Sequence, residues 1–112
     1  MRQGHVYQNG KFAGILTEVT SSEYVFRYDD LYYADDDLPA ISLTLSKSQR
    51  KHRSTYLFPF FFNMLSEGIN KRLQCRHLRI DEKDDFGLLL ATARHDTIGA
   101  VTIHPTKPDS DE

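Results

Sequence analysis

The fold is indicated most clearly by two adjoining segments, Asp85-Phe86-Gly87-Leu88-Leu89-Leu90 and Asp96-Thr97-Ile98-Gly99-Ala100-Val101. In the first, apolar residues recur at helical spacing, which predicts an amphipathic helix over residues 82–93 with Asp81 as its N-cap. In the second, a Gly-Ala step leads into β-branched residues, which predicts a strand over residues 98–103. A helix that leads through a polar turn into a strand is typical of a domain that mixes helices and strands.

The N-terminal part of the chain predicts a β-hairpin followed by a third strand. Residues 5–8 and 10–17 flank Asn9-Gly10, the pair preferred in a two-residue type I′ turn because both central residues need positive φ. Tyr24, Phe26 and Tyr28 then repeat with a period of two, which predicts a half-buried strand.

The next part predicts a fourth strand between two loops. Ile41, Leu43 and Leu45 alternate with hydroxyl side chains, which is the pattern of a strand with one polar face. Residues 29–39 are rich in turn-forming acids, and residues 47–54 are charged and lack periodicity, so both are predicted as loops.

The middle of the chain predicts a second helix. It begins near Pro59, which is tolerated at a first helical position, and Gly68 ends or kinks it before a short turn or helix over residues 70–75. The predicted fold class is therefore α+β, with a small twisted, mostly antiparallel β-sheet and two to three short helices packed on it. One domain is expected over residues 1–105, followed by an acidic C-terminal tail over residues 106–112.

Composition narrows the class of protein. The chain has 112 residues, a formal net charge of −2 and 39% hydrophobic residues, which is ordinary for one globular domain. A single cysteine, Cys75, cannot form an internal disulfide, and the N-terminus lacks the apolar region of a signal peptide. We therefore expect a cytoplasmic protein that does not enter a membrane.

Catalytic and metal-binding patterns are weak. The five histidines have no His-x-x-x-His spacing, and Cys75 and His77 lie two residues apart with no second pair to complete a tetrahedral site. No nucleophile–base set and no phosphate-binding loop emerges from the spacing. We expect no catalytic residue, no metal and no cofactor, and so no enzyme.

Two features point to binding. The first is an aromatic cluster in which either all rings fill the core, or at least one is exposed at a protein interface or a base-stacking surface, because Phe62 points about 100° away from Phe61 on a helix. The second is charge: between Lys47 and Arg79 lie eight basic residues and one acid, a local net charge of +7. The predicted partner-binding residues are Tyr56, Phe58, Phe60, Phe61, Phe62, Ser66, Arg50, Lys51 and Arg53.

An ordered set of motifs resembles the N-terminal subdomain of HipA-type toxin kinases. The set comprises residues 9–16, residues 26–29, residues 41–45, the segment Phe60-Phe61-Phe62-Asn63-Met64-Leu65-Ser66-Glu67-Gly68, and residues 84–89 and 95–101. Family members often have proline at the position of Ser66 and glycine at the position of Arg94. Since HipA-type kinases carry ATP, metal ions and the catalytic aspartate in a separate kinase domain, the resemblance transfers no catalytic residue to this chain.

The resemblance also implies a role. A stand-alone copy of this module is similar to HipS-type proteins of three-component HipBST toxin–antitoxin systems, which implies an antitoxin that neutralises a HipT-like serine/threonine kinase toxin, alongside a HipB-like DNA-binding protein reached through the complex. Two alternatives stay open. One is a non-inhibitory structural subunit that completes a split HipA-like kinase, and the other, less favoured, is a small nucleic-acid-binding protein that uses the basic segment.

Overall fold

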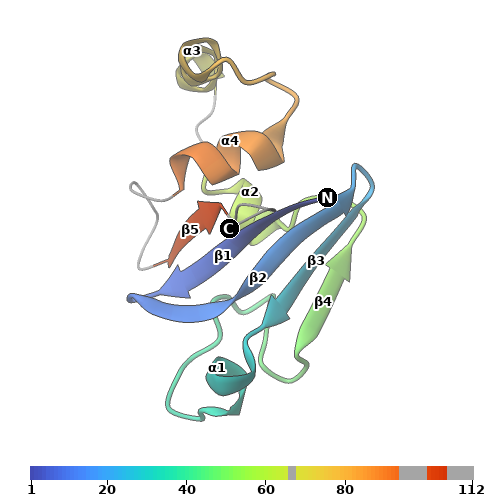
Figure 1. Cartoon of the computed structure of the whole chain (residues 1–112), viewed down its shortest axis with the longest axis vertical. Coiled ribbons are helices and arrows are strands. Elements are labelled where there is room, and N and C mark those ends of the chain that lie inside the picture. Colours follow the sequence, from blue (N-terminus) through green and yellow to red (C-terminus); the bar gives the residue numbers. More distant parts are fainter. Residues whose placement is uncertain (66–67, 94–100, 106–112) are drawn as a thin grey trace, which may run out of the picture.

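The computed structural model describes residues 1–65, 68–93 and 101–105, and within these ranges it forms a five-stranded sheet and four helices (Figure 1). The strands are β1 (Arg2–Gln8), β2 (Lys11–Thr20), β3 (Glu23–Tyr28), β4 (Lys51–Ser54) and β5 (Val101–Pro105). The helices are α1 (Asp30–Ala34), α2 (Pro59–Phe62), α3 (Gly68–Leu78) and α4 (Asp85–Thr92). The strand order is β4-β3-β2-β1-β5 with every pair antiparallel, so the predicted α+β class is confirmed.

The hairpin between β1 and β2 forms as predicted. Asn9 and Gly10 have φ values of 52° and 80°, and Gln8 pairs with Lys11 directly across the turn. Gly14 in β2 is required for a different reason: a Cβ there would lie 2.4 Å from the carbonyl oxygen of Arg27. At this position β3 therefore approaches the backbone of β2 more closely than a side chain would allow.

Three predictions between residues 29 and 54 are wrong: the loop over residues 29–39, the strand over residues 41–45 and the loop over residues 47–54. Residues 30–34 form α1, because the Asp29 carboxylate caps the helix and accepts hydrogen bonds from the backbone N–H groups of Leu31 and Tyr32. Residues 41–45 form no strand, and Leu43 is 98% exposed.

The fourth strand of the sheet is β4, within a segment predicted as a loop. Its inward-facing residue is a histidine, His52, which is 9% exposed and lies 2.9 Å from the carbonyl oxygen of Ser46 through Nε2. A polar residue at the inward position conceals the alternation that marks a half-buried strand.

The helix prediction near the C-terminus is correct in position but not in its cap. Asp84, and not Asp81, is the N-cap of α4: its carboxylate accepts a hydrogen bond from the backbone N–H of Gly87 at 3.1 Å. Asp81 instead accepts from the backbone N–H of Lys83. The predicted strand start at Ile98, the position of Arg94 and the predicted tail over residues 106–112 lie outside the described residues.

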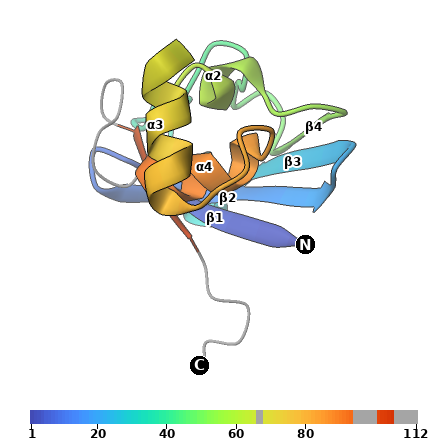
Figure 2. The same ribbon diagram turned by 90° about the horizontal axis from the view of Figure 1, so that it is seen from above.

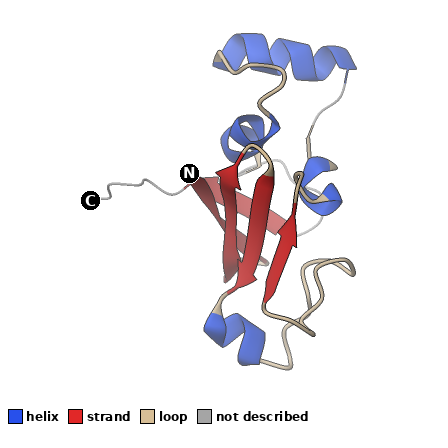
Figure 3. Cartoon of the chain, turned by 90° about the vertical axis from the view of Figure 1, so that its right-hand side faces the viewer, coloured by secondary structure: helices blue, strands red, loops and turns tan. Residues whose placement is uncertain are grey.

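Helices cover one face of the sheet. Phe61 of α2 and Phe86, Leu88 and Leu89 of α4 pack with the inward side chains of the strands to form one core. Helix α1 lies at one end of the sheet and α3 at the other (Figure 3). Seen from above, α3 lies across α4 on the side away from the sheet (Figure 2).

Candidate partner-binding site

The aromatic cluster is divided between core and surface. Phe61 is fully buried, with its ring centroid 5.9 Å from that of Phe26, and Phe58 is 7% exposed. Tyr56 and Phe62 are 67% and 45% exposed. The prediction that at least one large aromatic is exposed is therefore confirmed, because consecutive residues of α2 point in different directions.

Burial changes what each predicted residue can offer a partner. Phe58 and Phe61 belong to the core, so in this structure their rings do not form a free surface. Phe60 is partly buried and packs edge-on against Phe61, with centroids 5.2 Å apart. Ser66 lies outside the described residues.

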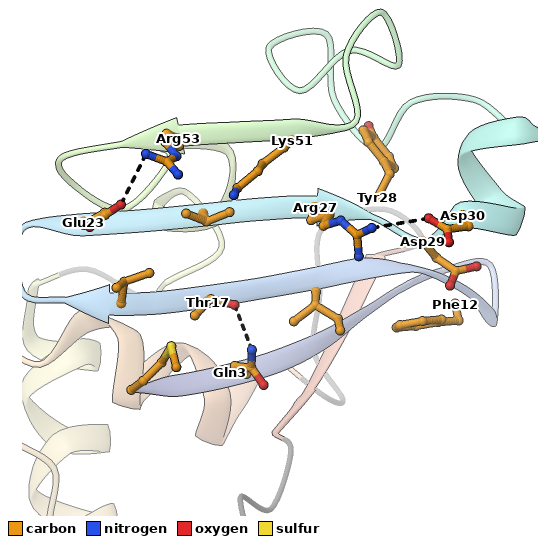
Figure 4. Close-up of a pocket in the computed structure, with 14 residues that line it drawn as sticks. Gln3, Phe12, Thr17, Glu23, Arg27, Tyr28, Asp29, Asp30, Lys51 and Arg53 are labelled. Carbon is orange, nitrogen blue, oxygen red and sulfur yellow. Dashed lines mark hydrogen bonds and ion pairs between the residues drawn. The ribbon is translucent and has the colours of Figure 1, made fainter.

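The basic residues predicted beside these aromatics lie elsewhere. Lys51 and Arg53 alternate with the inward-facing His52 on β4, so they point to the face of the sheet that the helices leave open, opposite α2 (Figure 4). Arg50 is bound within the domain: it donates to the Asp30 carboxylate at 2.6 Å and lies over the Tyr33 ring. The sequence-predicted interface is thus split between two faces of the sheet.

The +7 segment is also divided. Lys47, Arg50, Lys51 and Arg53 lie on or before β4, whereas the remaining four basic residues belong to α3 and its C-terminal end. Lys47 donates to the backbone carbonyls of Asp35 and Leu38, so it holds a loop in place. A segment that is basic in sequence is therefore not one basic surface in space.

Strand register defines the open face as rows of side chains. One row is Gln3, Thr17, Val25 and Arg53, and the adjacent row is His5, Ile15, Arg27 and Lys51. Residues directly opposite each other in an antiparallel sheet share a face. Side chains of both rows line a shallow depression of about 470 Å³ (Figure 4).

Three cations border this depression, and none makes a hydrogen-bonded ion pair. The Arg27 guanidinium lies 3.6 Å from the Asp30 carboxylate, and the Arg53 guanidinium lies 3.8 Å from that of Glu23. Lys51 makes no ion pair with a described residue. Asp30 is held mainly by Arg50, whose hydrogen bond lowers the pKa of that carboxyl below its usual range.

Aromatic rings fill the β1–β5 side of the same face. Phe12 lies edge-on against His5 at 5.1 Å between centroids, and Tyr7 lies edge-on against His104 at 5.2 Å. These rings pack on one another, so they do not form a row of bare ring faces.

Helix α3 offers a second surface. Ile69 and Leu73 are 62% and 54% exposed, and a groove lined by Leu73, Leu78 and Ala91 runs between α3 and α4. The helix is tied to α4 by the ion pair of Lys71 with Asp85 at 2.7 Å.

Among the described residues there is no group of three or more side chains that could hold a metal ion, and Cys75 is buried and unpaired. No helix in the same residues has the length and apolar character needed to cross a bilayer. The described residues thus offer surfaces through which another molecule can bind.

Sequence reasoning did not find the open face. The available signal is β2 itself, where Phe12, Ile15 and Val19 point away from the core while Ala13 and Leu16 point into it. Near-continuous apolar runs are typical of strands that are covered on both faces.

A family model and a solved structure agree on one family. A family model described as the HipA N-terminal domain matches residues 4–104. A solved structure of the N-terminal domain of HipA toxin superimposes with a TM-score of 0.72 at 29% sequence identity, covering 97% of this chain and 96% of that one. An uncharacterized protein of Haemophilus influenzae is 35% identical over 107 residues, covering 96% of this chain and 95% of that protein. A putative kinase of Sinorhizobium fredii, Y4dM, is 27% identical over 106 residues, which is 89% of this chain but 26% of that protein.

Proposed function

The chain belongs to the HipA N-terminal domain family, and we propose that it is an antitoxin that binds and neutralises a HipA-like (HipT) serine/threonine kinase toxin. The observation that carries the proposal is the match, in sequence and in fold, to the N-terminal domain of a protein named as a toxin. A relative named as a putative kinase contains the same module as about a quarter of its length. A chain of this family is therefore suited to contact the remainder of such a kinase.

The proposed anchors are the exposed aromatics at and before α2. Phe62 follows the buried Phe61 in α2, and its side chain is 45% exposed. A few large side chains that become buried on binding contribute most of the binding energy at protein interfaces. Inserted into the cleft of the kinase, Phe62 or Tyr56 would exclude its substrate.

Charge supports the same proposal. Kinase sites are rich in carboxylates that hold metal ions and accept protons, so cations on the antitoxin accelerate the encounter. Lys51 and Arg53 are available for this role, whereas Arg50 is held by Asp30. Ser66, which lies outside the described residues, stays a predicted partner-binding residue, and a HipB-like DNA-binding protein would join through the complex. The mechanism requires no cofactor and no chemistry by this chain.

Co-expression with a HipA-like kinase that lacks this module tests the proposal. The wild-type chain should restore growth, and purified chain should suppress phosphorylation by the kinase. Phe62→Ala should weaken binding by at least about 2 kcal/mol, as truncated interface anchors do.

Leu31→Ala is the matched control, because Leu31 is 83% exposed on α1 at the far end of the sheet. It should neutralise the kinase as well as the wild type does. Full neutralisation by a Tyr56→Ala/Phe62→Ala double variant would rule out the anchor assignment.

One alternative has a specific observation in its favour. Because the module is also part of a longer protein named as a kinase, the chain could complete a split kinase without inhibiting it. Unchanged toxicity in a stable complex would support that structural role, and rescue of growth would support inhibition.

A further inference from the structure

We infer that the open face of the sheet is a second docking surface, separate from the aromatic anchors, for a protein segment that carries both carboxylates and aliphatic side chains. Under the proposed function, on which this inference rests, the segment belongs to the HipA-like kinase. The open face is defined by Gln3 and His5 of β1, Phe12, Ile15, Thr17 and Val19 of β2, Val25 and Arg27 of β3, and Lys51 and Arg53 of β4.

The first argument is the composition of the central strand. Phe12, Ile15 and Val19 are partly exposed on the open face, while Leu16 of the same strand is fully buried on the other face. An antiparallel strand with one solvated face ordinarily alternates apolar with polar residues. β2 instead has apolar side chains on both faces, as strands do when both faces are covered.

The second argument is that the cations of the open face make no hydrogen-bonded ion pair with a described residue. Arg50, just before β4, donates to the Asp30 carboxylate at 2.6 Å, whereas Lys51 has no ion-pair partner among the described residues. Arg27 and Arg53 are 3.6 Å and 3.8 Å from their acids, without a hydrogen bond. These three side chains therefore keep donors available for carboxylates of a partner.

The third argument is spacing. Lys51 and Arg53 are two residues apart on one strand, so their Cα atoms are separated by about 6.6 Å along β4. An extended segment has the same repeat, and carboxylates at its positions i and i+2 would face both cations. Aliphatic side chains of the segment would then cover the partly exposed Ile15 at the centre of the face.

A nucleic acid fits the same face less well. Glu23, Asp29 and Asp30 border the depression beside the three cations, so the charge of the face is mixed. A continuous phosphate backbone would meet these acids as well as the cations, whereas carboxylates at two positions of a segment can face the cations alone. The aromatic rings at its other side are packed against one another at steep angles, so they do not form a parallel row on which successive bases could stack.

The test compares two charge reversals of equal size. One variant combines Arg27→Glu, Lys51→Glu and Arg53→Glu on the open face. The other combines Arg72→Glu, Arg79→Glu and Lys83→Glu, which are exposed positions on α3 and the following loop, outside the groove between α3 and α4. Each set replaces two arginines and one lysine, so the net charge of the two proteins is the same.

Association with the HipA-like kinase of the co-expression test is measured at low and high salt, after circular dichroism has shown that both variants are folded. The open-face variant should associate about tenfold to a hundredfold more slowly at low salt and lose most of its salt dependence. The α3 variant should remain close to the wild type.

The outcomes separate the two proposals. Absence of binding by the wild type would overturn the proposed function and this inference together. Binding by the wild type with equal losses in both variants, or with no loss in the open-face variant, would overturn the inference alone. Tight binding of an oligothymidylate by the wild type, abolished in the open-face variant, would also overturn it, because the ligand would then be a nucleic acid.

Discussion

The two faces of the sheet are built from the same strands, yet they differ in what their side chains do. On the covered face, Leu16, Phe26 and Ile103 are completely buried beneath α2 and α4. On the open face, Ile15, Arg27 and Lys51 form a row that is only partly covered. The covered face therefore determines stability, and the open face is free to determine binding, so substitutions on the two faces should have different consequences.

The largest effect is expected at the centre of the covered face. Phe61→Ala removes a fully buried ring that contacts Phe26, Phe58 and Phe60, and it should lower the free energy of unfolding by about 3–5 kcal/mol. Urea denaturation followed by circular dichroism measures the change. The adjacent Phe62→Ala serves as the control, and its effect should stay below about 1 kcal/mol because the ring is 45% exposed. Equal losses in the two variants would contradict the division of the aromatic cluster.

Tyr28 joins the covered face to the loop that replaces the predicted fourth strand. Its hydroxyl donates to the backbone carbonyl of Leu45 and accepts from the backbone N–H of Ile41, and burial raises the pKa of Tyr28. Tyr28→Phe leaves both backbone groups without this partner, and the expected loss of stability is about 1–3 kcal/mol. Tyr56→Phe is the control, since Tyr56 is 67% exposed. Hydrogen exchange of the Ile41 amide should accelerate in the first variant and not in the second.

The Tyr28 hydroxyl explains why the sequence pattern gave a wrong strand prediction at residues 41–45. Alternation of Ile41, Leu43 and Leu45 predicts a strand, but a strand there would need a backbone partner. Tyr28, 13 residues earlier, bonds both ends of the segment instead, so Ile41 and Leu45 turn inward while Leu43 points to solvent. Local periodicity cannot report a side chain that is distant in sequence.

Other features were predictable because their causes are local. The type I′ turn depends on Asn9 and Gly10 alone, and the position of α4 follows from apolar residues at helical spacing, Phe86, Leu89 and Leu90. The candidate site was harder to predict from the sequence, because a run of basic residues does not show which face of the sheet each residue occupies. Only the pairing of β4 with β3 places Lys51 and Arg53 beside Arg27 and away from α2.

A smaller effect is expected at the junction of β1 with α4. Arg2 donates to both carboxylate oxygens of Asp84, at 2.8 Å and 3.0 Å. These hydrogen bonds are the main reason why the pKa of Asp84 is lowered. Asp84→Ala removes the N-cap as well, with an expected cost of about 0.5–2 kcal/mol at neutral pH.

The pH dependence of this cost has a defined sign. A carboxyl whose pKa is lowered on folding stabilises the protein fully above its unfolded pKa, and that contribution is lost as the pH falls through the folded value. The difference in stability between the wild type and Asp84→Ala should therefore be constant near neutral pH and shrink only below the ordinary carboxyl pKa of 3.8. Thermal melts at several pH values measure it. A difference that already shrinks near neutral pH would show that Asp84 is not held by Arg2 as described.

The smallest effect on stability is expected on the open face, at Ile15, next to the buried Leu16 in β2. Ile15→Thr keeps a β-branched side chain in the strand, and the expected change in the free energy of unfolding is below about 1 kcal/mol. Leu16→Ala, its neighbour on the covered face, should cost about 2–5 kcal/mol. If the open face only contacts water, Ile15→Thr should also leave partner binding unchanged. If a partner covers it, the threonine hydroxyl becomes buried beside Val25, and binding weakens although the isolated chain is as stable as before. Measured together by denaturation and by titration with the kinase, this pair of variants separates a residue that stabilises the fold from one that contributes to an interface.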